Sequence, residues 1–206
     1  MSNKLIIFVA YGGGDKLITP CEDATIVYKP YAGYSRGGGE FIDKVSQDYA
    51  EQIEQYEYVS FMGDDCEFEA QDMVGACGYG FHLFQLAMTR DSFYSWEHLR
   101  QHNGEYRHVL FIEMMFTMSV EFWRNNKHLF CESKSGWGLD FLLCERHTEQ
   151  YQKQPVVFDC YVFRHTRPVN SDGLIDGLSK SDEMYDIINK YGLYHYHPTP
   201  VSQVKA

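Results

Sequence analysis

The chain has 206 residues, of which 44% are apolar, 16% aromatic and 23% charged. A chain of this length and composition can bury a sizeable core, which excludes a disordered or collagen-like protein. Its 18 Lys and Arg residues against 29 Asp and Glu residues give a formal net charge of −11, so bulk attraction to a polyanion such as nucleic acid is not expected.

Two features bear on the compartment and on covalent partners. No apolar run is long enough to cross a bilayer, and the apolar residues 5–11 lack the flanks of a signal peptide. The 6 cysteines are widely spaced with no CxxC pair, which is typical of free thiols and not of a disulfide framework or a zinc site. We therefore expect a cytoplasmic protein with no membrane partner and no disulfide partner.

The first part of the chain alternates between strand and helix patterns. Residues 5–10 are continuously apolar and stop at three glycines, 12–14, which predicts a strand covered on both faces. A second short strand is expected at 25–28, an amphipathic helix over 41–56, and a further strand at 58–62. Strand, strand, helix and strand in this order predict an α/β fold with a mostly parallel sheet flanked by helices.

The pattern is weaker in the middle of the chain. Residues 79–88 are compatible with a strand, and 91–104 with a loop that contains a short helix. The stretch 109–118 is apolar apart from one glutamate, and Ser119 after it can cap a helix that runs to about residue 130.

The last part returns to clear signals. A Gly-Trp-Gly sequence at 136–138 precedes an expected helix, and residues 156–163 read as a strand. A final helix is expected to start at Ser181 and to stop at Gly192. Because no repeat, linker or low-complexity segment interrupts the chain, residues 1–206 are expected to form a single domain.

An acidic cluster carries the sharpest local signal. The strand expected at 58–62 runs directly into Gly63, Asp64 and Asp65, with Glu67 shortly after. Ligands of open α/β sheets bind at the carboxyl ends of strands, and adjacent carboxylates repel unless a cation neutralises them. Oxygen ligands of this kind suit Mn²⁺ or Mg²⁺ bound together with a substrate's phosphates. A solvated acidic turn after a strand is the equally common alternative.

Three further residues are candidates for chemistry, each with a structural alternative. Glu113 lies in an otherwise apolar run, where a carboxylate needs either a function or an arginine partner. Asp140 is expected in the first turn of a helix, whose dipole favours the ionised form of a proton acceptor, although Asp is also an ordinary first-turn residue. His165 follows the strand at 156–163 and could complete a metal site as a neutral imidazole, or be a surface residue.

Taken in order, these segments resemble a known group of enzymes. Residues 56–65 look like the strand that ends in the DXD-type motif of GT-A glycosyltransferases. A plant and bacterial family of uncharacterised GT-A-like proteins is more similar still, and the similarity is carried by Glu113-Met114-Met115, Trp123, Gly136-Trp137-Gly138-Leu139-Asp140-Phe141 and residues 156–165. The resemblance covers roughly residues 40–168. The first acid of the family's triplet is Gly63 here, and Asp65 matches its last acid.

The resemblance implies a fold and a reaction. The fold would be a single GT-A-like (Rossmann-like) domain, with residues 1–70 as the nucleotide-binding half and residues 71–206 as the acceptor and catalytic half. The reaction would be metal-dependent transfer of a sugar from a nucleotide-sugar donor to an acceptor hydroxyl. Asp65 and His165 would hold Mn²⁺ or Mg²⁺, with Asp64 nearby, to stabilise charge on the leaving phosphate.

The remaining roles follow from the same resemblance. Asp140 would take the acceptor's proton in an inverting enzyme, or position the substrate in a retaining one. Glu113 would bind hydroxyls of the donor sugar or of the acceptor. The donor nucleoside would meet the end of the first strand, at Ala10, Tyr11 and Gly12, with Tyr11 as a candidate to stack on the base. Arg36 and Trp137 complete the residues expected to bind the donor.

Two acceptors stay open. Aromatic and histidine side chains at Tyr94, Trp96, His98, His102, Tyr106 and His108 could stack on a sugar or on an extruded base, or simply pack. The acceptor could thus be a glycan or metabolite hydroxyl, or a hydroxymethylated base in phage DNA. The DNA acceptor needs a basic track, which the negative chain could supply only if Arg100, Arg107, Arg124, Lys127, Arg164 and Arg167 converge.

Two other classes of function compete with the transferase. A nucleotide-sugar-binding module without catalysis would explain why Gly63 stands where the family has an acid. A metal-dependent phosphohydrolase also clusters carboxylates at strand ends, but it predicts that more acids and histidines converge than Asp64, Asp65, Glu67 and His165.

Overall fold

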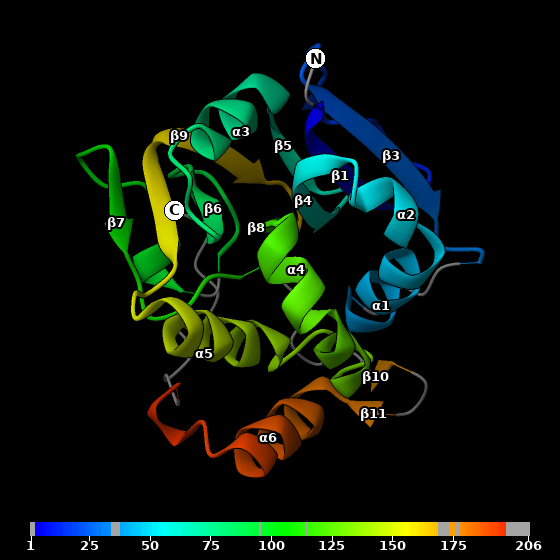
Figure 1. The fold of residues 1–206 in the computed structure, drawn as a ribbon, viewed down its shortest axis with the longest axis vertical. Coiled ribbons are helices and arrows are strands. Elements are labelled where there is room, and N and C mark those ends of the chain that lie inside the picture. Colours follow the sequence, from blue (N-terminus) through cyan, green and yellow to red (C-terminus); the bar gives the residue numbers. More distant parts are fainter. Residues whose placement is uncertain are drawn as a thin grey trace.

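A curled nine-stranded sheet organises the molecule, with helices packed around it (Figure 1). The computed structural model describes residues 3–33, 38–94, 96–113, 115–168, 174–175 and 178–196. The strands of this sheet are β1 (Asn3–Tyr11), β2 (Ile18–Thr19), β3 (Ala24–Pro30), β4 (Tyr56–Gly63), β5 (Cys66–Glu69), β6 (Leu83–Met88), β7 (Tyr106–His108), β8 (Phe116–Ser119) and β9 (Val156–His165). A small antiparallel pair consists of β10 (Leu174–Ile175) and β11 (Leu178–Ser179).

The described helices are α1 (Gly38–Asp48), α2 (Ala50–Ile53), α3 (Ala70–Cys77), α4 (Val120–Asn126), α5 (Leu139–Tyr151) and α6 (Lys180–Tyr191). Short 3-10 helices cover Glu97–Leu99, Lys127–Glu132 and Tyr194–Tyr196. Within this part of the chain, no helix is long and apolar enough to cross a membrane. All 6 cysteines are free thiols.

The sheet is mixed, and its strand directions place several strand ends together. The order is β2-β5-β9-β6-β8-β4-β1-β3, with β7 pairing to β9. Four of its described pairings are parallel and four are antiparallel. Because β8 runs antiparallel to both β4 and β6, the strands β1, β4, β6 and β9 all point the same way. Their carboxyl ends therefore share one edge of the sheet, where α/β proteins bind ligands.

One apolar core underlies the sheet and its helices. The side chains of Leu5–Val9 in β1 are fully buried, as expected for a central strand covered on both faces. Trp123 of α4 is fully buried and donates its indole N–H to the Ser46 hydroxyl of α1 at 3.1 Å. Helix α6 packs on the start of α5, at the bottom of Figure 1, where Gly138 leaves room for Ile187. These contacts make the chain a mixed α/β domain with a single core cluster.

Two of the predicted helix ends are confirmed, and one predicted helix start is displaced along the chain. Ser119 caps α4 as expected, its hydroxyl accepting a hydrogen bond from Phe122 N at 3.1 Å. Gly192 ends α6 in the left-handed conformation, at φ +69°. The helix begins at Lys180, one residue before the predicted start at Ser181, and its cap is Ser179, whose hydroxyl accepts a hydrogen bond from Asp182 N.

Two elements differ more substantially from the expected pattern. The helix predicted over 41–56 is divided into α1 and α2, because the backbone leaves the helical conformation at Tyr49, with φ −118° and ψ 16°. Among the described residues of the apolar stretch 109–118, the strand β8 begins only at Phe116, and it pairs antiparallel to β4. Periodicity does not reveal this antiparallel strand because a short apolar run is the same in either orientation.

Candidate functional site

Asp64 links the ends of two central strands. It follows β4 directly, and its side chain is only 4% exposed. One carboxylate oxygen, Oδ2, accepts a hydrogen bond from Gly12 N at 2.7 Å, just beyond the end of β1. The other oxygen, Oδ1, accepts from the guanidinium of Arg167. Both oxygens of this buried charge are thus occupied, as a buried carboxylate requires.

Asp65 and His165 lie side by side at the same sheet edge. Asp65 Oδ2 is 3.3 Å from His165 Nε2, and the His165 side chain is 5% exposed. Backbone pairing holds the two residues together. Strand β5 pairs with β9 in the register Cys66↔His165, and Thr166 N donates a hydrogen bond to Asp65 O at 2.9 Å. The structure therefore brings together two residues that the sequence analysis assigned to one site.

The orientation of the His165 ring follows from its second nitrogen. Nδ1 lies 2.9 Å from the carbonyl oxygen of Phe93, and a carbonyl can only accept, so Nδ1 carries a hydrogen. In the neutral form of His165, the lone pair of Nε2 consequently points toward Asp65. In the doubly protonated form, Nε2–H forms an ion pair with the Asp65 carboxylate. Burial acts to raise the pKa of Asp65, but the hydrogen bond and charge of His165, together with the charge of Arg167, outweigh it and lower that pKa.

Gly63 leaves room for the Asp65 carboxylate. A Cβ atom at Gly63 would lie 2.5 Å from Asp65 Oδ1, closer than real contacts allow. The Asp65 carboxylate folds back over this glycine, so any side chain at position 63 would push it away. A glycine at this position is thus compatible with the placement of the Asp65 carboxylate beside His165.

Arg167 is the basic side chain of this site. Its Nη2 binds Asp64 Oδ1, and its Nε lies 3.4 Å from Asp65 Oδ2. The arginine side chain is 51% exposed, whereas the Asp64 side chain is buried. Tyr31 lies beside Asp64 and Arg167. Burial and the charge of Asp64 raise the pKa of the Tyr31 hydroxyl. The sequence indicated Arg167 only as a member of a possible basic track, because its local pattern contains no sign of its pairing with Asp64 and Asp65.

The donor set of Asp65 and His165 fits a divalent ion that has two protein ligands. Two ligands that bind one ion at about 2.1 Å, with an angle of about 100° between them, are about 3.2 Å apart. The distance between Asp65 Oδ2 and His165 Nε2 is close to this value. In the described part of the chain, no group of three or more His, Cys, Asp and Glu side chains is arranged to hold a metal. Other ligands would have to come from substrate and water, which is usual for Mg²⁺.

Asp140 and Glu113 belong to elements that meet at the sheet edge. Glu113 precedes β8, whose first residue Phe116 is opposite Phe61 near the carboxyl end of β4. Its backbone N–H donates to the Gln85 side chain of β6 at 2.7 Å. Helix α5, which carries Asp140, packs on the same segment through the rings of Phe111 and Phe141, 4.9 Å apart. Their roles as base and hydroxyl-binding residue stay predictions.

The electrostatics of Asp140 differ from the expectation. Oδ1 of Asp140 is buried and has no hydrogen-bond partner among the described residues. Burial raises the pKa of Asp140 to about 7, against the opposing effect of backbone N–H groups at Phe141, Asp140 and Gly138. The helix N-terminus favours the ionised form, as expected, but desolvation outweighs its effect on the pKa. A pKa near neutrality is nevertheless what a general base requires.

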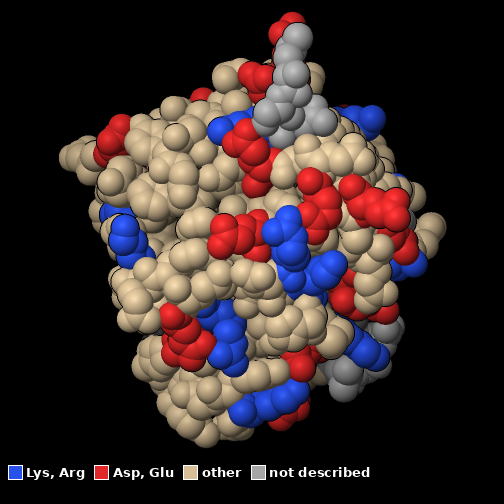
Figure 2. Space-filling model, in the orientation of Figure 1, with Lys and Arg blue, Asp and Glu red and all other residues tan. Residues whose placement is uncertain are grey.

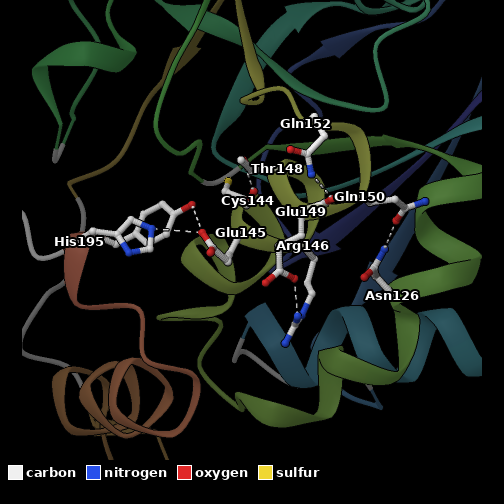
Figure 3. Close-up of polar contacts among 10 residues, drawn as sticks. Asn126, Cys144, Glu145, Arg146, Thr148, Glu149, Gln150, Gln152 and His195 are labelled. Atoms are coloured by element: carbon white, nitrogen blue, oxygen red, sulfur yellow. Dashed lines mark hydrogen bonds and ion pairs between the residues drawn. The ribbon is translucent and has the colours of Figure 1, made fainter.

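The start of α5 is enclosed by the chain that follows α6. Glu145 Oε2 accepts a hydrogen bond from the Tyr196 hydroxyl at 3.0 Å and lies 3.1 Å from His195 Nε2 (Figure 3). The Tyr196 ring stacks on Phe141, with their centroids 5.4 Å apart. This cover contributes to the dry surroundings of the first turns of α5.

The loop that carries Trp137 is held in place by one carboxylate. Glu183 of α6 accepts hydrogen bonds from Lys134 N at 2.5 Å, Ser135 N at 2.9 Å and the Ser133 hydroxyl at 3.1 Å. Burial acts to raise the pKa of Glu183, but the hydrogen bonds from Ser135, Lys134 and Ser133 outweigh it and lower that pKa. Trp137 is half-buried, and Lys180 Nζ lies 6.0 Å from its ring. Glu183 had no signal in the sequence.

The residues expected at the donor nucleoside are placed in part. Ala10 O accepts from Asp64 N at 3.1 Å, and Gly12 binds the Asp64 side chain, so both adjoin the acidic pair. Tyr11 is half-buried against Tyr28, with their ring centroids 5.4 Å apart, and its hydroxyl donates to Gly14 O at 2.5 Å. Arg36 lies outside the described residues.

The basic side chains do not converge into a track. Each arginine proposed for it pairs with a carboxylate: Arg100 with Glu97, Arg107 with Asp159, Arg124 with Glu54, Arg164 with Glu67, and Arg167 with Asp64. Lys127 lies over the Trp123 ring. Figure 2 shows basic groups interspersed with acidic ones on the face that it displays.

The aromatic residues at 94–108 mostly pack within the protein. Tyr94 is 6% exposed, and Trp96 and His98 contact Phe111. Tyr106 is 40% exposed, but it adjoins other aromatic rings of the sheet, including Phe158.

Comparisons with known proteins identify no family. No family model and no curated protein matches the chain. Among solved structures, 28 chains match. One of them, the crystal structure of A197 from STIV, is 9% identical, with a TM-score of 0.46 over 84% of this chain and 98% of that chain.

Proposed function

We propose that the protein is a metal-dependent glycosyltransferase with a GT-A-like fold, which moves a sugar from a nucleotide-sugar donor to an acceptor hydroxyl. The observation that carries this proposal is the pairing of Asp65 Oδ2 with His165 Nε2 at 3.3 Å, at the shared carboxyl edge of β4 and β9. The ring is turned toward Asp65 by the Phe93 carbonyl, as in metal-binding histidines whose other nitrogen is fixed.

Different residues of the chain have different roles in such a reaction. Mn²⁺ or Mg²⁺ held by Asp65 and His165 would supply a Lewis acid for the charge on the departing diphosphate. Asp64 holds the backbone of Gly12 in place beside it. Asp140, whose pKa burial raises to about 7, takes the proton of the acceptor hydroxyl. Glu113 binds hydroxyls of the donor sugar or of the acceptor.

The ion pairs of the arginines favour a glycan or a small metabolite as the acceptor over hydroxymethylated DNA. Duplex binding needs several cations that are free to neutralise phosphates. Arg100, Arg107 and Arg124 each already pair with a carboxylate, so they contribute no free charge.

One observation favours a second candidate, a nucleotide-sugar-binding module without catalysis. Both oxygens of Asp64 are occupied by Gly12 and Arg167, which leaves Asp65 and His165 as the protein ligands for an ion. A site with few ligands holds an ion weakly, and a weakly held ion contributes less to catalysis.

Release of nucleoside diphosphate from a panel of nucleotide sugars, with and without Mn²⁺, tests the proposal. A glycosyltransferase gives slow, metal-dependent release from one donor, and Asp65→Asn suppresses it. A binding module gives no release under any condition but is stabilised against heat by a nucleotide sugar. A phosphohydrolase instead cleaves simple phosphoesters, and that result would contradict the proposal.

A further inference from the structure

Arg167 lies between solvent and two acids, the buried Asp64 and the partly exposed Asp65. Its Nη2 binds Asp64 Oδ1 and its Nε lies 3.4 Å from Asp65 Oδ2, so its cationic head faces both carboxylates. Half of its side chain is exposed, at 51%, although Asp64 is 4% exposed. The guanidinium therefore compensates a buried charge while it stays accessible from outside.

Arg107 shows how this chain holds an arginine that has a purely structural role. Arg107 binds the buried carboxylate of Asp159, and its Nη2 also donates to the carbonyl oxygens of His98 at 2.5 Å and Arg100 at 2.8 Å. Its side chain is 23% exposed. Backbone carbonyls that a ligand cannot displace hold this arginine in place. Within the described part of the chain, Arg167 instead contacts side chains, those of the two acids and Tyr31.

An incoming diphosphate adds negative charge at this site. Its negative charge adds to that of Asp64 and Asp65, so a hydrogen-bond donor that turns toward it favours its approach. A guanidinium has five N–H donors in a planar fork that suits phosphate oxygens as well as carboxylates. Arg167 is attached just beyond Thr166, which is anchored to Asp65 O, so its head is already at the edge where the donor's phosphates are expected.

We propose that Arg167 is an exchangeable cation, which pairs with Asp64 and Asp65 in the ligand-free protein and turns to bind the diphosphate when the donor enters. This inference rests on the proposed function, because it assigns the diphosphate of a nucleotide sugar as the group that displaces the acids. Asp64 is then not a ligand of the donor but the resting partner of the residue that binds it.

Calorimetric titration with inorganic pyrophosphate, in the presence of EDTA, tests the exchange without a metal ion. Arg167→Gln should weaken binding by about tenfold or more, as expected for the loss of a charge-assisted hydrogen bond. Asp64→Asn should strengthen binding severalfold because it releases Arg167 from its resting partner. Arg164→Gln is the matched control, since Arg164, three residues before Arg167, pairs with Glu67 and Asp91 and should leave binding unchanged.

The double variant keeps the test decisive if Arg167→Gln alone is unstable, because it removes the buried charge of Asp64 together with the charge of its partner Arg167. The gain from Asp64→Asn should disappear when Arg167→Gln is also present, which makes the two changes non-additive. Additive effects, no binding of pyrophosphate by the wild-type protein, or equal binding by wild-type protein and Arg167→Gln would each overturn the exchange. The proposed function has a separate readout, the release of nucleoside diphosphate from nucleotide sugars.

Discussion

The carboxylate of Asp65 lies 3.3 Å from the imidazole Nε2 of His165, although the two residues are far apart in the sequence. Two features of the fold produce this contact. The strands β4 and β9 run in the same direction, so both end at one edge. The sheet curls so that β5, which follows β4 after a tight turn, pairs with the end of β9. The carboxylate and the imidazole are therefore held by paired backbone, not by mobile loops.

Replacement of His165 should remove the metal response of the protein. His165→Gln keeps a polar side chain but lacks the imidazole Nε2, so the affinity for Mn²⁺ in the presence of a nucleoside diphosphate should fall at least about tenfold. Isothermal titration calorimetry measures this change. His128→Gln, at an exposed histidine, should bind like the wild-type protein. Equal Mn²⁺ affinity in His165→Gln would remove His165 from the site.

Addition of a single methyl group at Gly63 should disturb the Asp65 carboxylate. A Cβ atom there would lie 2.5 Å from Asp65 Oδ1, so Gly63→Ala should rotate the carboxylate away from His165. We expect a loss of about 1–3 kcal/mol in the free energy of unfolding, together with weaker Mn²⁺ binding. Gly14→Ala is the matched control, because nothing lies within 4 Å of a Cβ atom at Gly14. Unchanged Mn²⁺ binding in Gly63→Ala would show that the placement of Asp65 does not depend on this glycine.

The buried carboxyl of Asp140 should make stability depend on pH. Its pKa is raised from 3.8 to about 7, so between these values the folded state binds a proton that the unfolded state does not. The free energy of unfolding should therefore fall as the pH rises from about 4 to about 7, by a few kcal/mol from this group. Asp140→Asn should remove this part of the slope and be more stable than the wild-type protein at pH 8.

Denaturant unfolding at several pH values compares the two proteins. Asp186→Asn, at an exposed acid of α6, should keep the wild-type slope. If Asp140→Asn keeps that slope as well, Asp140 does not titrate near neutrality. In activity measurements, the wild-type rate should rise with an apparent pKa near 7, and Asp140→Asn should bind donor but transfer slowly.

The loop before α5 should depend on a single carboxylate. Glu183→Gln replaces an acceptor of several hydrogen bonds from Ser133, Lys134 and Ser135 with a neutral amide. We expect it to lower the free energy of unfolding by about 1–3 kcal/mol, as measured by denaturant unfolding. Glu51→Gln, at an exposed position of α2, should be nearly neutral. A neutral effect of Glu183→Gln would mean that the loop is held by other contacts.

Local sequence signals predicted the strands that position the site. Continuous apolar runs indicated β1, β4 and β9, and the acids after β4 and the histidine at the end of β9 were identified from those strands. The cap at Ser119 and the stop at Gly192 were predicted because both depend on one residue and its immediate neighbours.

The remaining features depend on contacts that local patterns do not contain. The antiparallel insertion of β8 between β4 and β6 and the pairing of β5 with β9 are choices of topology. The partners of Arg167 and Glu183 come from segments distant in the chain. The pKa of Asp140 depends on burial, which the helix position alone does not determine.

The most direct test of the central claim is an anomalous difference map from crystals soaked with Mn²⁺ and a nucleoside diphosphate. The proposed site predicts one strong peak bonded to both Asp65 Oδ2 and His165 Nε2 and to a phosphate oxygen. A manganese peak elsewhere, with Asp65 and His165 still in direct contact, would contradict it.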